Sequence, residues 1–130
     1  MMARRTASRL LAAAMVAASL PALACGVCIE DKVAVTYDHA VVQSAVARGH
    51  VVVFAAIETR SSPQVSAQSV RSAARRASGV DRASVRTASE PAALSFALDP
   101  RVQSPDTALS SIEKAAAQPG LRLTLLRVAR

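Results

Sequence analysis

The sequence predicts a mixed α+β fold in which residues 50–130 form two similar halves with the element order βαββαβ. In each half an apolar segment is followed by a serine–proline pair, at residues 62–63 and 104–105, and then by an amphipathic pattern. Serine caps a helix well, and proline suits the first helical position because its missing N–H would have no partner there. Gly79 and Gly120 follow the two patterns, and glycine readily adopts the left-handed turn that ends a helix.

Residues 50–57 and 93–98 are predicted to be the central strands of an antiparallel sheet. The first is apolar on both faces, as expected of a strand that is covered on at least one side. In the second strand, large apolar residues alternate with small ones, and the large ones should face the core: Leu94, Phe96 and Leu98. Residues 81–89 and 121–128 mix polar and apolar residues and are predicted to be edge strands.

Each helix of this domain carries an apolar stripe that should be buried against the sheet. The first stripe comprises Val65, Val70, Ala73, Ala74 and Ala77, and the second comprises Leu109, Ile112, Ala115 and Ala116. The simplest way to bury both is a sandwich with two helices on one face of a four-stranded antiparallel sheet. Arg71, Arg75 and Arg76 lie outside the first stripe and are expected to be solvated.

Residues 1–24 have the organisation of a secretory signal peptide. Three arginines precede an uncharged apolar run at residues 10–20, and residues 22–24 fit the small-x-small cleavage rule. The run is short for a membrane span, so a retained anchor is the less favoured interpretation. We therefore expect a periplasmic or secreted protein that begins at Cys25.

Lipidation of Cys25 is the alternative for this new N-terminus, and it is the one case in which we expect membrane attachment. Lipoprotein signals usually place leucine three residues before the cysteine, where this chain has Ala22. Soluble export is accordingly preferred.

Composition and motifs exclude two large functional classes. Removal of three arginines with the signal peptide lowers the formal net charge from +7 to +4, and the chain has no Trp, one Tyr and two Phe. This leaves no aromatic platform for nucleic acid. The chain also lacks a glycine-rich phosphate loop, a Gly-x-Ser-x-Gly elbow and a His-Glu-x-x-His pair, so we do not expect an enzyme.

Residues 29–48 are predicted to form one additional helix before the first strand. Glu30 and Asp31 lie in its first turn, where they favour the helix dipole, and Gly49 would end it. Its apolar residues recur at intervals of three to four. Such a helix could pack on the sheet or offer a surface to another protein, and the pattern is compatible with both.

The stretch from Gly79-Val80 through a strand to Asp99-Pro100, followed by a serine–proline-led helix, resembles the heavy-metal-associated domain family. The resemblance covers residues 50–128 and implies a ferredoxin-like fold. That family holds a soft metal through a Cys-x-x-Cys loop between its first strand and first helix. The corresponding residues 58–62 contain no cysteine, so these ligands cannot be transferred to this chain.

Cys25 and Cys28, in the segment 25–49, are the predicted metal site. Two thiolates can hold linear Cu(I) or a similar soft ion, whereas tetrahedral Zn²⁺ needs about four ligands. The same pair can instead close a disulfide, which an oxidising compartment favours. The chain is thus predicted to be an exported soft-metal-binding protein or, alternatively, a non-metal interaction module with a Cys25–Cys28 disulfide or thiol switch.

Two histidines were considered as further ligands. His39 is 11 positions from Cys28, which on a continuous helix is about 16 Å along the axis. We therefore expect His39 to lie in the core or at an interface and His50 to have a structural role.

Overall fold

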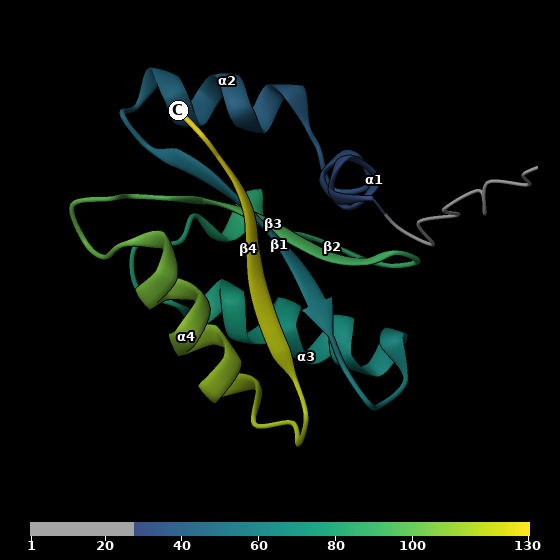
Figure 1. The fold of residues 1–130 in the computed structure, drawn as a ribbon. Helices are drawn as coiled ribbons and strands as arrows, with labels where there is room; N and C mark the ends of the chain where they lie inside the picture. Colours follow the sequence, from purple (N-terminus) through teal and green to yellow (C-terminus); the bar gives the residue numbers. More distant parts are fainter. Residues whose placement is uncertain (1–27) are drawn as a thin grey trace, which may run out of the picture.

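The computed structural model describes residues 28–130, and they form a mixed α+β structure around a four-stranded antiparallel sheet (Figure 1). In chain order the elements are α1 (Ile29–Ala34), α2 (His39–Ala47), β1 (Val51–Glu58), α3 (Pro63–Arg76), the 3₁₀ turn η1 (Arg82–Ser84), β2 (Arg86–Ser89), β3 (Ala92–Leu98), α4 (Pro105–Ala116) and β4 (Arg122–Ala129). The strand order is β2-β3-β1-β4, so the predicted central and edge positions are confirmed. The edge strand predicted over residues 81–89 is shorter than expected, because residues 82–84 form η1 and β2 begins at Arg86. This arrangement is compatible with a ferredoxin-like topology.

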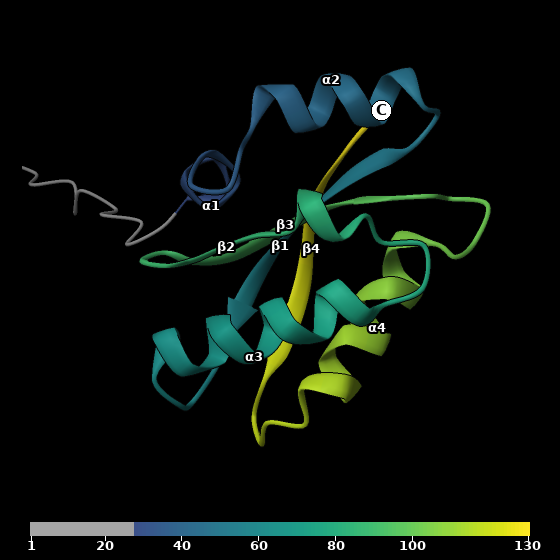
Figure 2. The same cartoon turned by 180° about the vertical axis from the view of Figure 1, so that it is seen from behind.

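Helices cover both faces of the sheet, as Figure 2 shows from behind. On one face, α3 and α4 pack on a large apolar cluster that includes Val53, Phe96 and Leu98. On the other face, α1 and α2 pack on a smaller cluster that includes Val52 and Phe54 of β1. The prediction of two helices on one face is therefore correct for α3 and α4, and the N-terminal segment adds a third layer.

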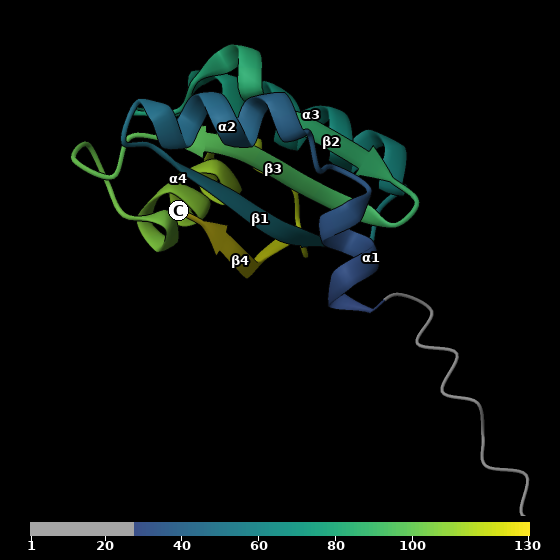
Figure 3. The same ribbon diagram turned by 90° about the horizontal axis from the view of Figure 1, so that it is seen from above.

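The prediction of a single continuous helix over residues 29–48 is wrong. The helix stops at Ala34, and Asp38, with extended backbone (φ −131°, ψ 111°), begins α2 in a new direction (Figure 3). Oδ1 of Asp38 accepts hydrogen bonds from the backbone N–H groups of Ala40 and Val41, at 3.0 and 3.3 Å. Aspartate favours such a capping position over a helix interior, which explains the break.

The predicted first residues of both helices are confirmed, whereas the predicted serine caps and helix stops are confirmed only in part. Pro63 and Pro105 are the first residues of α3 and α4. The hydroxyl of Ser104 accepts from the Thr107 N–H at 3.2 Å, but Ser62 makes no capping hydrogen bond to α3. At the end of α4 it is Ala117, not a glycine, that takes the left-handed conformation, with φ 52°. Gly79 lies in the turn after α3 with φ +79°, and a Cβ there would come within 2.8 Å of Val102 Cβ.

Two residues of the predicted buried stripes are exposed: Val65, which is 52% exposed, and Ala115. Ala77 and Ala116 are partly buried against the large cluster. The buried residues are Ser66, Ala67, Val70, Ala73 and Ala74 in α3, and Ala108, Leu109 and Ile112 in α4. A serine can occupy the buried face of α3 because its hydroxyl is hydrogen-bonded, as described below.

A β-bulge interrupts the alternation that the sequence predicts for β4. Ala55 pairs with Leu125, whereas the preceding Phe54 pairs with Arg127, so Leu126 is an extra residue. Leu126 packs against the smaller cluster, beside α1 and α2. Leu125, opposite Ala55 on this edge strand, is 37% exposed.

Two valines of α3 test the observed helix phase. Val70→Ala should lower the free energy of unfolding by about 1.5–3 kcal/mol, because Val70 is fully buried and two methyl groups leave a cavity. Val65→Ala should change it by less than about 0.5 kcal/mol, because Val65 is exposed. Urea unfolding followed by circular dichroism measures both, and equal losses would contradict this orientation of α3.

Candidate functional site

Cys28 is the one member of the predicted cysteine pair that the structure describes. It is exposed and precedes α1 as its N-cap, with extended backbone (φ −64°, ψ 155°). Its carbonyl oxygen accepts hydrogen bonds from the N–H groups of Asp31 and Lys32, at 3.1 and 3.2 Å, while its side chain makes no capping hydrogen bond. Cys25 and the predicted signal peptide, residues 1–24, lie outside the described residues. Cys28 is thus an exposed residue at the start of α1.

The loop at residues 58–62, where the resembling family carries its cysteines, is held by hydroxyl and amide groups. Thr59 Oγ1 lies 2.7 Å from Ser66 Oγ, and the Ser66 hydroxyl donates to Gln118 Oε1 at 2.8 Å. Gln118 Nε2 in turn donates to Ser69 Oγ at 3.0 Å. These bonds tie the loop to α3 and to the end of α4, which is a structural function.

The two histidines lie apart from any cluster of ligands. His39 begins α2, is exposed, and has Nδ1 3.2 Å from the hydroxyl of Tyr37. Of the two predicted positions, the core is therefore wrong and the interface stays a prediction. His50 is half-buried, with Nε2 3.9 Å from Asp99 Oδ2 and Nδ1 buried without a hydrogen-bond partner. Within residues 28–130, no three His, Cys, Asp or Glu side chains are grouped so that they could hold a metal ion.

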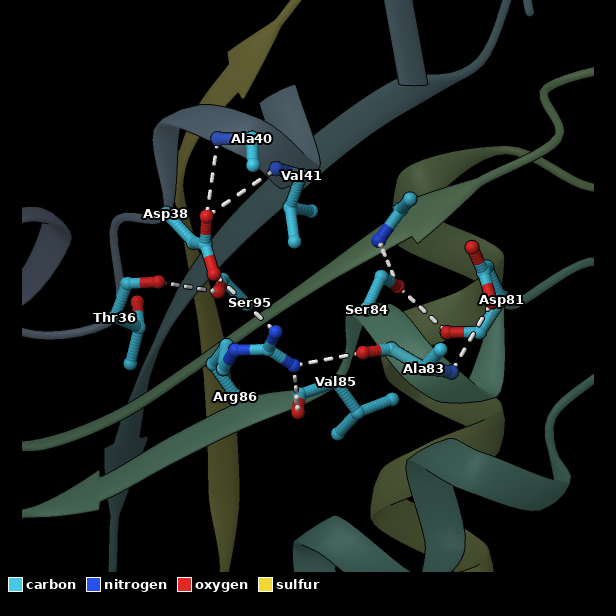
Figure 4. A network of polar contacts seen from close by, with 11 residues as sticks. Thr36, Asp38, Ala40, Val41, Asp81, Ala83, Ser84, Val85, Arg86 and Ser95 are labelled. Carbon is cyan, nitrogen blue, oxygen red and sulfur yellow. Dashed lines mark hydrogen bonds and ion pairs between the residues drawn. The ribbon is translucent and has the colours of Figure 1, made fainter. Parts of the chain in front are cut away.

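A groove of about 250 Å³ separates α2 from η1 and β2. It is lined by Asp38, Ala40, Val41, Ser44, Arg48, Asp81, Ala83, Ser84 and Arg86. Two ion pairs cross it: Arg48 lies 3.0 Å from Asp81, and Arg86 lies 3.2 Å from Asp38 (the second pair is drawn in Figure 4). The charged groups of the groove are therefore neutralised in pairs across it.

Both aspartates also cap the element that they begin. Asp38 caps α2, and Oδ1 of Asp81 accepts from the Ala83 N–H at 3.0 Å, capping η1 (Figure 4). The hydroxyl of Ser84 donates to the Asp81 carbonyl oxygen and accepts from the Ala97 N–H, at 2.6 and 2.7 Å, which joins η1 to β3. The contacts of Asp38, Asp81 and Ser84 thus attach α2 and η1 to the neighbouring strands of the sheet.

These contacts lower the pKa of both carboxyl groups from their ordinary value. For Asp38 the largest cause is the hydrogen bond from the backbone N–H of Val41, with a smaller contribution from Arg86. For Asp81 the largest cause is the hydrogen bond from the Arg48 side chain. Since both folded pKa values lie below 3.8, the ionised groups stabilise the fold above that pH, and this stabilisation is lost as the pH falls through the folded values.

The sequence pattern singles out none of these four residues for a site: Asp38, Arg48, Asp81 and Arg86. The capping preference of Asp38 was a local signal that could have located the start of α2. The ion pairs carry no such signal, because their partners are 33 and 48 positions apart.

Comparison of the chain with protein-family profiles, curated proteins and solved structures found no match. The resemblance to the heavy-metal-associated family therefore stays a prediction from short motifs. None of the helices in residues 28–130 is long and apolar enough to cross a membrane.

The different causes of the two pKa shifts give a direct test. Arg48→Gln should raise the pKa of Asp81 toward 3.8, because it removes the largest cause of that shift. Arg86→Gln should leave the pKa of Asp38 below 3.8, because the hydrogen bond from the Val41 N–H, the largest cause there, remains. Carboxyl-carbon NMR titrations measure both values. An Asp81 pKa that is unchanged by Arg48→Gln would contradict this assignment of causes.

Proposed function

We propose that this chain is an exported soft-metal-binding protein that holds an ion such as Cu(I) between Cys25 and Cys28. The observation that carries the proposal is the exposed position of Cys28 at the start of α1. Cys25 lies three residues before it in the sequence, so the two sulfurs belong to one short segment of the chain. Two thiolates suit a soft ion of low coordination number.

In this proposal the remaining residues form a ferredoxin-like domain preceded by two short helices. The strand order β2-β3-β1-β4 and the βαββαβ element order of residues 51–129 support that topology. The domain anchors the cysteine segment through α1, because Val33 is buried against the sheet and Glu30 forms an ion pair with Arg127 of β4. The protein then binds or passes on an ion and catalyses no reaction.

The second candidate is a non-metal interaction module with a Cys25–Cys28 disulfide or thiol switch. A specific observation favours it: the segment of α1 and α2 exposes four large apolar side chains, each 41–54% exposed. They are Ile29, Val35, Tyr37 and Val46. A partner protein could cover such side chains while the inner faces of both helices stay on the sheet.

A metal titration separates the two functions. The reduced mature protein should bind one Cu(I) in competition with a chromogenic chelator under anaerobic conditions, and Cys28→Ser should abolish binding because one thiolate is lost. His39→Gln serves as the matched control and should bind like the wild type. Absence of binding by the reduced wild type would overturn the metal proposal and leave the interaction module.

Mass spectrometry of the exported protein tests the predicted N-terminus. Cleavage after Ala24 should give a chain that begins at Cys25 and carries no lipid. If Cys25 and Cys28 form a disulfide, their sulfurs should accept two alkyl groups only after reduction. A diacylglycerol adduct on Cys25 would contradict soluble export and remove one of the two thiols.

A further inference from the structure

The helices α1 and α2, with the residues between them, form a layer of their own on the sheet, here called the N-terminal layer (residues 29–47; Figures 1 and 3). Its attachment differs from that of α3 and α4. Those two helices contribute six residues to the large core cluster: Val70, Ala73, Ala74, Ala108, Leu109 and Ile112. The N-terminal layer contributes two fully buried apolar side chains to the smaller cluster, Val33 and Ala45.

Val41 and Val42 of α2 are partly buried against the same cluster, and ion pairs add to this apolar attachment. Three pairs join the N-terminal layer and its C-cap to the rest of the domain: Glu30–Arg127, Asp38–Arg86 and Arg48–Asp81. Each arginine side chain in these pairs is 41–46% exposed. Exposed pairs of this kind are screened by salt, so this attachment depends on ionic strength.

Two neutral contacts add to the attachment. The ring of Tyr37 stacks on that of Phe54, with the ring centroids 6.3 Å apart. The hydroxyl of Ser95 donates to the carbonyl oxygen of Thr36 at 3.0 Å, while the buried Thr36 Oγ1 has no hydrogen-bond partner. An unsatisfied buried hydroxyl costs free energy while the N-terminal layer lies on the sheet. The Thr36 hydroxyl would bond to water if the layer left the sheet.

The chain geometry allows the N-terminal layer to leave by itself. It is joined to β1 through Gly49, which has φ +72° and no atom within 4 Å of the position of a Cβ. With six and nine residues, α1 and α2 are too short to be stable helices in water. They should therefore dock and order together, or detach and unfold together.

We propose that the N-terminal layer is a salt-sensitive cover, which detaches as one unit from the sheet while the βαββαβ domain stays folded. Detachment uncovers the second face of the sheet, with Val52, Phe54 and Ala97. It also releases Cys28 from its position at the start of α1. The device does not depend on metal binding, because its contacts all lie between residues 30 and 129.

Hydrogen exchange followed by mass spectrometry tests the cover on the mature protein. Amides of α1 and α2 should exchange faster in about 1 M than in about 0.01 M sodium chloride, since the screening length falls from about 30 to about 3 Å. Amides of β1, α3 and α4 should stay protected, because they report opening of the whole domain.

Single substitutions at low salt should reproduce the effect of screening. Arg86→Gln and Arg48→Gln should each speed exchange in α1 and α2 by about 1.4- to 5-fold, as expected for loss of one exposed pair. Arg101→Gln is the matched control, because Arg101 pairs with Asp99 in the same loop and not with the N-terminal layer. It should leave α1 and α2 unchanged.

Two results would overturn the proposal. One is exchange of α1 and α2 at the rate of the slowest β1 amides in both salt concentrations, because that shows opening only with the whole domain. The other is an acceleration of α1 and α2 by Arg101→Gln equal to that of Arg86→Gln. A variant that merely destabilises the whole domain is recognised by faster exchange in α3 and α4.

Discussion

The burial of β1 on both faces is the constraint on which the rest of the structure depends. Every side chain from Val51 to Ile57 is at most 5% exposed, and alternate residues of a strand point to opposite faces. One face needs α3 and α4, and the other needs a second cover because Phe54 and Val52 would otherwise meet water. The two short helices before β1 supply that cover, which explains why a chain with a complete βαββαβ domain has an additional layer.

The βαββαβ domain could be predicted because its signals are local. An apolar run, a serine–proline pair and an amphipathic stripe each depend on neighbouring residues, and the structure confirms the elements that they indicate. The N-terminal segment could not be predicted so well. Its apolar residues keep a helical spacing across the break, so the periodicity predicts one helix. The structure has two helices instead, because Asp38 caps the start of α2. Its contacts with Arg86 and Arg127 join residues 48 and 97 positions apart and leave no pattern in the sequence.

The wrong assignments within the domain have one kind of cause, which is a polar or backbone interaction that overrides apolar spacing. Ser66 is fully buried in α3 because its hydroxyl bonds to Thr59 and Gln118, and Val65 is correspondingly turned toward solvent. In β4 the bulge at Leu126 shifts the alternation by one residue, so that Arg127 lies opposite Phe54, on the face of α1 and α2. Neither a hydrogen-bonded core serine nor a bulge changes the hydrophobic pattern from which such predictions are made.

The hydrogen bonds of Ser66 also show that the loop before α3 keeps its structure without the metal that the resembling family binds there. The loop at residues 58–62 leads into α3, and its position is fixed by Thr59, Ser66 and Gln118, so it needs no bound ion for its structure. Cys28 lies at the start of α1, on the opposite face of the sheet from α3 (Figures 1 and 2). An ion held by the cysteine pair would therefore be bound independently of the loop that the family uses. Since a fold does not by itself determine function, the metal proposal rests on the N-terminal sulfurs alone.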